Sequence, residues 1–86
     1  MQGEKFLFSS ILAKLIVTKE GKKLGFVKDV TFETKSGELI SLILKDPTSY
    51  SKHLNLERTS ENELLIPFSA IIANGDFIVI SEEDLI

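Results

Sequence analysis

Few side chains in this sequence of 86 residues have types and spacing suited to catalysis. The single histidine, His53, falls in the longest polar stretch, and no cysteine is present to serve as a nucleophile or a soft metal ligand. An activated nucleophile needs a neighbouring base, and a structural or catalytic zinc site needs three or four converging ligands. A lone loop histidine meets neither requirement. We therefore expect no catalytic residue, no metal and no cofactor.

Two pairs of neighbouring acids could in principle perform acid–base chemistry, namely Asp29 with Glu33 and Glu61 with Glu63. We expect Asp29 to accept backbone N–H bonds at an irregular point of a strand and the glutamates to lie at solvated strand ends. The run 21–25, Gly-Lys-Lys-Leu-Gly, lacks the Gly-Lys-Ser/Thr sequence of a phosphate loop. These residues indicate a hairpin, and the chain is not expected to be an enzyme.

The composition is that of an ordinary globular protein, with 43% hydrophobic and 27% charged residues. We expect a single domain over residues 1–86, with its core at about 8–81. Because no cysteine asks for an oxidising compartment, a cytoplasmic location is favoured. The apolar stretch 6–13 is shorter than the roughly 20 residues that span a bilayer. We expect neither membrane insertion nor a signal peptide.

Alternating apolar residues and turn signals predict an all-β fold of five to six mostly antiparallel strands that close into a small barrel. A short helical turn over residues 11–14, capped by Ser9 or Ser10, is expected before the first strand. The polar stretch 47–62 is predicted to be the longest loop, with Leu54 and Leu56 anchoring its middle. The expected strands cover residues 15–18, 24–34, 38–45, 63–68 and 77–80.

The second strand changes phase part-way along. Val27 lies on an odd position, whereas Val30 and Phe32 lie on even ones. Successive side chains of a strand point to opposite faces, so one extra residue is needed to keep all three apolar groups inward. We predict a β-bulge near Lys28 or Asp29.

Two segments carry a family resemblance. The first has the pattern Gly-x-Val-x-Asp-Val and the second is Ile-Pro-Phe. Together they resemble the signature segments of the PRC-barrel family, small β-barrels named for the photosynthetic reaction centre and also found in a ribosome-maturation factor. The matching residues are Gly25, Val27, Asp29, Val30, Ile66, Pro67 and Phe68.

This resemblance implies a β-barrel that acts by binding other macromolecules without catalysis. Free-standing barrels of this length are similar to small archaeal PRC-barrel proteins, some of which resemble adaptors of an FtsZ-based cell-division machinery. We therefore expect a protein-interaction or adaptor module. An RNA- or ribosome-associated assembly factor, like the barrel of the ribosome-maturation factor, is the alternative.

Apolar residues on strand positions that should face outward indicate an interface. By alternation, Phe26, Leu39 and Ile43 fall on the outer faces of their strands. Contiguous apolar surface of this kind is usually covered by another subunit. We expect a homodimer that also binds another cytoplasmic protein.

Lysines cluster around the first hairpin and could form a basic docking patch, although solvated hairpin tips are the simpler explanation. Against RNA binding stand the net charge of −3, the single arginine Arg58 and aromatic residues at apparent core positions, because stacking on bases needs exposed rings. The residues of this candidate patch are Lys19, Lys22, Lys23 and Lys28.

Overall fold

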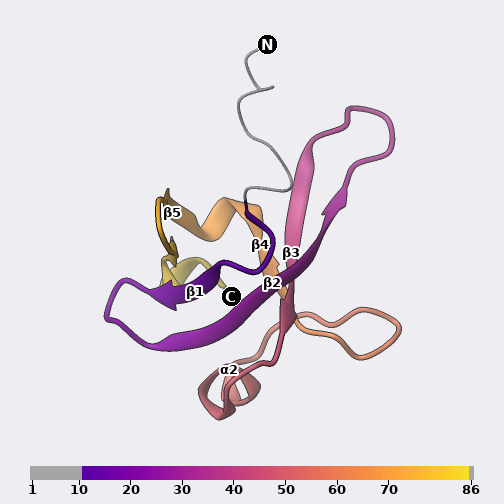
Figure 1. Cartoon of the computed structure of the whole chain (residues 1–86). Coiled ribbons are helices and arrows are strands. Elements are labelled where there is room, and N and C mark those ends of the chain that lie inside the picture. The colour runs from indigo at the N-terminus through magenta and orange to yellow at the C-terminus, as the bar shows by residue number, and fades with distance from the viewer. Residues whose placement is uncertain (1–10, 86) are drawn as a thin grey trace.

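Six strands in the described residues, 11–85, form one sheet in the computed structural model (Figure 1). Their order across the sheet is β4-β3-β2-β1-β6-β5. Neighbours β1 and β6 run parallel, and the other four pairs are antiparallel. The bounds are Leu15–Thr18 for β1, Lys23–Phe32 for β2, Leu39–Lys45 for β3, Leu65–Pro67 for β4, Ile71–Asn74 for β5 and Ile78–Ile80 for β6.

The sheet curls but does not close. Its two edge strands, β4 and β5, are consecutive in the chain and are joined by the short 3-10 helix η2, Phe68–Ala70, without pairing with each other. Pro67 ends β4 and has no N–H to extend a ladder, which favours the turn into η2. The predicted number of strands and their mostly antiparallel pairing are therefore confirmed, whereas the predicted closure is wrong.

A β-bulge interrupts β2 where the change of phase predicts it. The register passes from Val27 opposite Leu44 to Asp29 opposite Ile43, which leaves Lys28 as the extra residue. The N–H of Val30 donates to Oδ1 of Asp29 at 2.8 Å. This bond confirms the expected role of the carboxylate, and the bulge keeps both valines of this strand buried. Phe32, which we expected to point inward as well, is 41% exposed, because the register shifts again between Thr31 and Phe32.

Aliphatic side chains fill the inner side of the curled sheet. Burying one such side chain contributes roughly 1.5–3 kcal/mol, so these contacts dominate the stability of the fold. Each strand except β5 contributes to this core, and so does the segment that precedes β4. The buried apolar residues are Ile11, Ile16, Leu24, Val27, Val30, Leu42, Leu44, Leu56, Leu64, Ile66, Ala70, Ile78 and Ile80.

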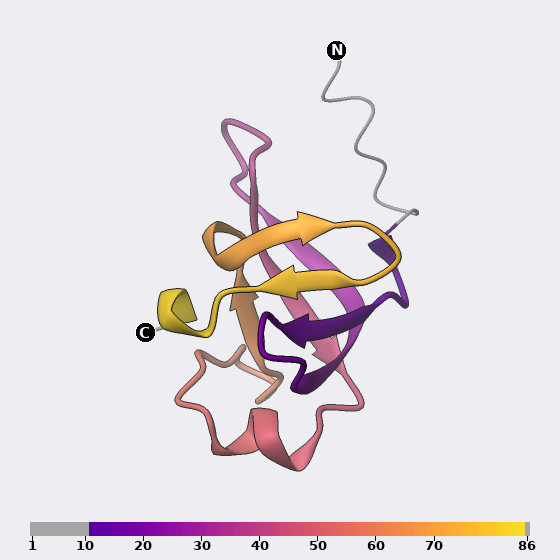
Figure 2. The same cartoon turned by 90° about the vertical axis from the view of Figure 1, so that its left-hand side faces the viewer.

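The segment predicted as the longest loop contains a short helix, α2, Ser49–His53. Figure 2 shows α2 at the end of the molecule opposite the tip of the β2–β3 hairpin. The N-cap residue Thr48 accepts a bond from the N–H of Ser51 at 3.2 Å. The helix has only five residues and no apolar periodicity, so the sequence pattern did not reveal it. As predicted, Leu56 reaches the core and Leu54 packs against it.

The start of the described chain differs from the expected helical turn. Residues 11–14 make a turn in which the N–H of Lys14 donates to the carbonyl of Ile11 at 3.2 Å, and Ala13 has a φ of 69°. These residues do not support a helical turn, and the predicted caps Ser9 and Ser10 lie outside the described residues. No helix within residues 11–85 is long and apolar enough to cross a membrane.

Candidate docking groove

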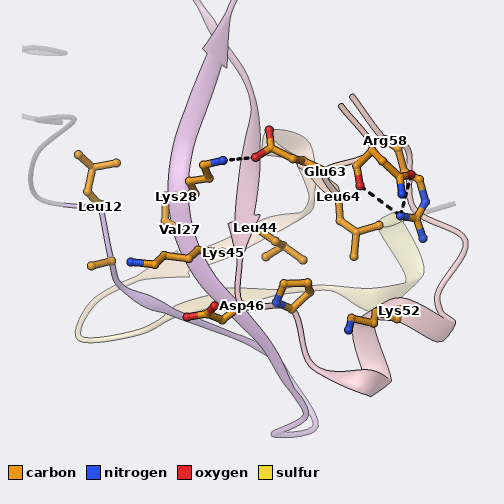
Figure 3. A pocket seen from close by; sticks show the side chains of 13 residues that line it. Leu12, Val27, Lys28, Leu44, Lys45, Asp46, Lys52, Arg58, Glu63 and Leu64 are labelled. Carbon is orange, nitrogen blue, oxygen red and sulfur yellow. Dashed lines mark hydrogen bonds and ion pairs between the residues drawn. The ribbon is translucent and has the colours of Figure 1, made fainter. Parts of the chain in front are cut away.

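A groove of about 790 Å³ lies between the paired strands β2 and β3 and the chain segment 46–64. Figure 3 shows side chains from both sides converging on this space. Val27, Leu44 and Leu64, all of which also belong to the core, form its apolar floor. These three side chains are only 2%, 4% and 3% exposed, so the floor is the outer wall of the core, and the exposed apolar part of the lining is Leu12 at 41%.

One side of the groove depends on a close approach between β2 and the chain that leaves β3. Gly25 has a φ of 149°, and a Cβ atom there would lie only 2.9 Å from the carbonyl oxygen of Lys45. Asp46 follows with a φ of 51°. The N–H of Thr48 then donates to the carbonyl of Leu24 at 3.0 Å, and its hydroxyl donates to that of Lys23 at 2.7 Å. These contacts fasten the segment 46–48 to β2.

The other side is the turn that precedes β4. The N–H of Leu44 donates to the carbonyl of Leu64 at 3.0 Å, which joins this turn to β3. Arg58 forms an isolated bridge with Leu64, and its guanidinium donates to the carbonyl and side-chain oxygens of Asn62 at 3.3 and 3.1 Å. The guanidinium therefore braces its own turn, and Glu63 is held next to the bulge of β2.

Six ionisable side chains surround the apolar floor. Within residues 11–85, four of the nine cationic side chains but only two of the twelve acidic ones line the groove, so these give it a charge of +2 while the rest of this range carries −5. A charge reversal of this size indicates a preference for anionic groups. The six residues are Lys28, Lys45, Lys52, Arg58, Asp46 and Glu63.

The four cations differ in how far they are already engaged. The amine of Lys28 donates to the carboxylate of Glu63, and this hydrogen bond, together with the attraction between the charges, raises the pKa of Lys28 above its usual value. In contrast, the side-chain amines of Lys45 and Lys52 make no hydrogen bond or ion pair with any residue in the described range. These two lysines are available to a ligand.

The groove holds no arrangement typical of an active site. His53 lies outside its lining, is exposed, and its Nδ1 is 2.6 Å from the carbonyl of Ser49 in its own helix. Across residues 11–85, no group of three or more histidine, cysteine, aspartate or glutamate side chains is placed to hold a metal ion. The geometry offers binding through apolar contact and charge.

Comparison with known proteins decides the family. A model of the PRC-barrel domain matches residues 3–85, almost the whole chain. The chain belongs to the PRC-barrel domain family. The uncharacterized protein MJ1118 of Methanocaldococcus jannaschii is 30% identical over 82 residues, which cover 95% of this chain and 88% of that protein.

The signature residues of this PRC-barrel have separate structural roles. Gly25 permits the close approach beside the groove, and Asp29 accepts the backbone bond at the bulge. Ile66 is fully buried, and Pro67 ends β4. Phe68, which we expected to continue the strand, is instead the first residue of η2 and is 37% exposed.

The predicted basic patch is distributed over two places in the PRC-barrel. Nζ of Lys19 lies 3.8 Å from Glu83, and Nζ of Lys22 lies 5.2 Å from the ring centre of Tyr50. Lys23 is exposed at the start of β2. Lys28 is five residues farther along that strand, roughly 16 Å away, where it lines the groove. The structure therefore brings Lys19 and Lys22 to the same end of the molecule and places Lys28 elsewhere.

The three predicted interface residues differ in exposure. Phe26 is 40% exposed and pairs with Leu15 on one side and Lys45 on the other. Ile43 is half-buried opposite Asp29. Leu39 is also half-buried, but it packs against the core. Of the three residues, Phe26 and Ile43 thus lie close together on the outer face of the β2–β3 pair.

Sequence reasoning missed most of the groove. Leu12, Lys45, Lys52 and Arg58 line it from three separate segments, and no motif connects them. The one available signal was Asp46-Pro47, which marks where the chain leaves β3. That signal does not tell where the chain returns, so it could not predict which side chains meet.

Proposed function

We propose that this PRC-barrel protein is a non-catalytic interaction module that self-associates and docks another protein in the cytoplasm. The observation that supports this proposal most is the exposed apolar surface on the outer face of β2 and β3. The inner face of the same strands already packs in the core. Phe26 is 40% exposed, its partner Leu15 on β1 is half-buried, and so is Ile43, two residues before Lys45 on β3. Covering such surface releases water from apolar groups, which drives association.

The charges around this surface suit a second copy of the chain. Lys45 lies opposite Phe26, and Asp29 lies opposite Ile43, so the acid and the amine occupy opposite corners. A two-fold axis along the diagonal from Phe26 to Ile43 would bring each apolar residue onto its own counterpart. The same axis would bring Lys45 of each copy towards the aspartate of the other, which makes the surface self-complementary.

A change of mass tests self-association. Phe26→Glu should convert the protein from a dimer to a monomer, measured by light scattering over a range of concentrations, because a buried unpaired carboxylate is strongly disfavoured. Phe77→Glu is the matched control, since Phe77 is 52% exposed and lies in the turn between β5 and β6, outside the proposed interface. A monomeric wild type at all concentrations, or equal loss of mass in both variants, would contradict the proposal.

An adaptor role in archaeal cell division is the finer form of this proposal. It is supported by the similarity to small free-standing archaeal barrels and by the archaeal source of the relative. The alternative, RNA or ribosome binding, has weaker support, because Lys19 and Lys22 already face groups of their own chain. The expected burial of the aromatic residues is wrong and is no argument against it, since Phe26, Phe32, Phe68 and Phe77 are 40%, 41%, 37% and 52% exposed. Such binding would fall steeply with salt and would be weakened by Lys22→Glu combined with Lys23→Glu.

A further inference from the structure

We infer that the groove between β2–β3 and the segment 46–64 binds an acidic peptide segment that also carries apolar side chains. The inference rests on the proposed function only in taking the partner to be a protein. It does not depend on self-association. Two properties of the groove support it, namely an apolar lining whose rim is exposed at Leu12 and an excess of positive charge.

The apolar lining extends from the core floor to the rim. Above Val27, Leu44 and Leu64, the side chain of Leu12 lines one side and is 41% exposed, and Pro47 lines another. Leucine, isoleucine or phenylalanine side chains of a ligand would lose contact with water here. A volume of about 790 Å³ accommodates a few such side chains.

The excess of positive charge favours a peptide in which acidic residues flank the apolar side chains that enter the groove. Lys28 and Arg58 are held by Glu63 and by the turn around Asn62, so they contribute field without being free to move. Lys45 extends from the end of β3 and Lys52 from α2, on different sides of the floor (Figure 3). Carboxylates flanking an apolar residue could reach both amines.

The lining fits a peptide better than a nucleic acid. No aromatic side chain of residues 11–85 lines the groove, so this part of the chain offers bases no stacking platform. The carboxylates of Asp46 and Glu63 interrupt the ring of cations, which would repel a continuous row of phosphates. A peptide can place its few carboxylates next to the lysines alone.

The acidic end of this chain is already bound elsewhere. Glu82 accepts a bond from the hydroxyl of Tyr50 at 2.6 Å, Glu83 pairs with Lys19, and Leu85 packs against the core. This segment has the chemistry that suits the groove, but its side chains are engaged at another surface. This segment is therefore not the occupant, and we assign the groove to a segment of a different protein.

Selection from a random peptide display library tests the inference. Enriched peptides should combine aspartate or glutamate with leucine, isoleucine or phenylalanine. Fluorescence anisotropy with a labelled enriched peptide should show about threefold weaker binding to Lys52→Glu, because reversal of a rim charge replaces attraction by repulsion, and Lys52 lies outside the surface proposed for self-association. The matched control Lys35→Glu changes the net charge equally at an exposed position outside the lining and should bind within about 1.5-fold of wild type.

A second pair of variants tests the contribution of the apolar lining to peptide binding. Leu12→Ser should weaken peptide binding by about threefold or more, whereas Phe77→Ser, which also removes an exposed apolar side chain, should not. No enrichment, enrichment without acidic residues, or equal binding to the groove and control variants would overturn the inference. So would tight binding of a single-stranded RNA probe that only the groove variant loses.

The outcomes are distinguishable from those for self-association. A dimeric wild type that selects no peptide overturns the groove assignment alone. A monomeric wild type that binds acidic peptides overturns self-association and leaves the groove assignment standing.

Discussion

Two charged clusters of this PRC-barrel differ in whether their charges are satisfied within the chain. Around the hairpin 19–23, Lys19 and Lys22 face Glu83 and the ring of Tyr50, and Tyr50 in turn donates to Glu82. We call this set the tail cluster. In the groove, two lysines lie over apolar side chains without a partner in the described part of the chain.

This difference indicates that the tail cluster holds parts of the fold together, whereas the groove is a surface that can bind a ligand. In the tail cluster the contacts hold η3, Glu82–Leu85, against the hairpin and α2, so a ligand would have to displace existing bonds. In the groove the amines would gain a partner without losing one. The two regions have similar numbers of lysines. They differ in whether the chain itself provides acidic or aromatic groups that these lysines contact.

Helix α2 links the two regions, because Tyr50 belongs to the tail cluster and Lys52 to the groove. The position of this helix therefore affects both. Substitutions that disturb its attachment should loosen the two regions together, while substitutions within one region should leave the other intact.

The largest expected effect comes from Gly25→Ala at the side of the groove. The added Cβ would lie 2.9 Å from the carbonyl oxygen of Lys45, at a φ of 149° that alanine rarely adopts. We expect a loss of about 3 kcal/mol in the free energy of unfolding, measured by urea denaturation, from combined strain and overpacking.

The matched control for that substitution lies beside the tail cluster. Gly21 also has a positive φ, 91°, but a Cβ there would meet nothing within 4 Å. Gly21→Ala should therefore cost only about 1 kcal/mol, which reflects backbone strain alone. Equal losses for the two variants would show that the close approach at the groove does not matter for stability.

Which features of the fold could be predicted from the sequence depends on how far apart in the chain the interacting residues lie. The bulge at Lys28 was predictable because alternation is a local property of one strand. The role of Gly25 beside the groove was not, because its neighbour lies about twenty residues later, across the β2–β3 pair. The open edge between β4 and β5 also escaped prediction, since strand pairing at the two ends of a sheet leaves no periodic signal.

The candidate groove shows the same limit more strongly. Its residues come from a turn, two strands, a short helix and a loop, and each residue type is ordinary in its own segment. Phe26 was found because its apolar character is unusual at an outward strand position. Lys45 and Lys52 were not, because surface lysines are common and only the folded chain reveals the apolar floor between them.

A smaller effect is expected for Thr48→Ala, which weakens the attachment of α2. The hydroxyl caps the helix and also donates to the carbonyl of Lys23 at 2.7 Å. Its removal should cost about 1–2 kcal/mol in the free energy of unfolding. Thr48→Ser keeps both bonds and should recover most of this loss. Loss of stability in the serine variant equal to that in alanine would assign the effect to the methyl group.

The smallest expected effect is a shift in the titration of Tyr50, the only tyrosine in a chain without tryptophan. The hydrogen bond from its hydroxyl to Glu82, followed by desolvation and the charge of that glutamate, raises the pKa of Tyr50 above its usual value. The absorbance of tyrosinate measures this pKa directly. Glu82→Gln should lower it towards about 10, and Glu20→Gln, which removes only the weakest of these influences, should lower it less.

The direction of the pH dependence follows from the same bond. Because the folded protein holds the phenol proton more tightly than the unfolded chain does, the bond stabilises the fold fully below the unfolded pKa of about 10. That contribution is lost as the pH rises through the raised pKa of the folded state. Thermal unfolding of wild type and Tyr50→Phe should therefore converge at strongly alkaline pH. A difference that is independent of pH would mean that Tyr50 acts through packing, and the tail cluster would then be fastened by something other than this hydrogen bond.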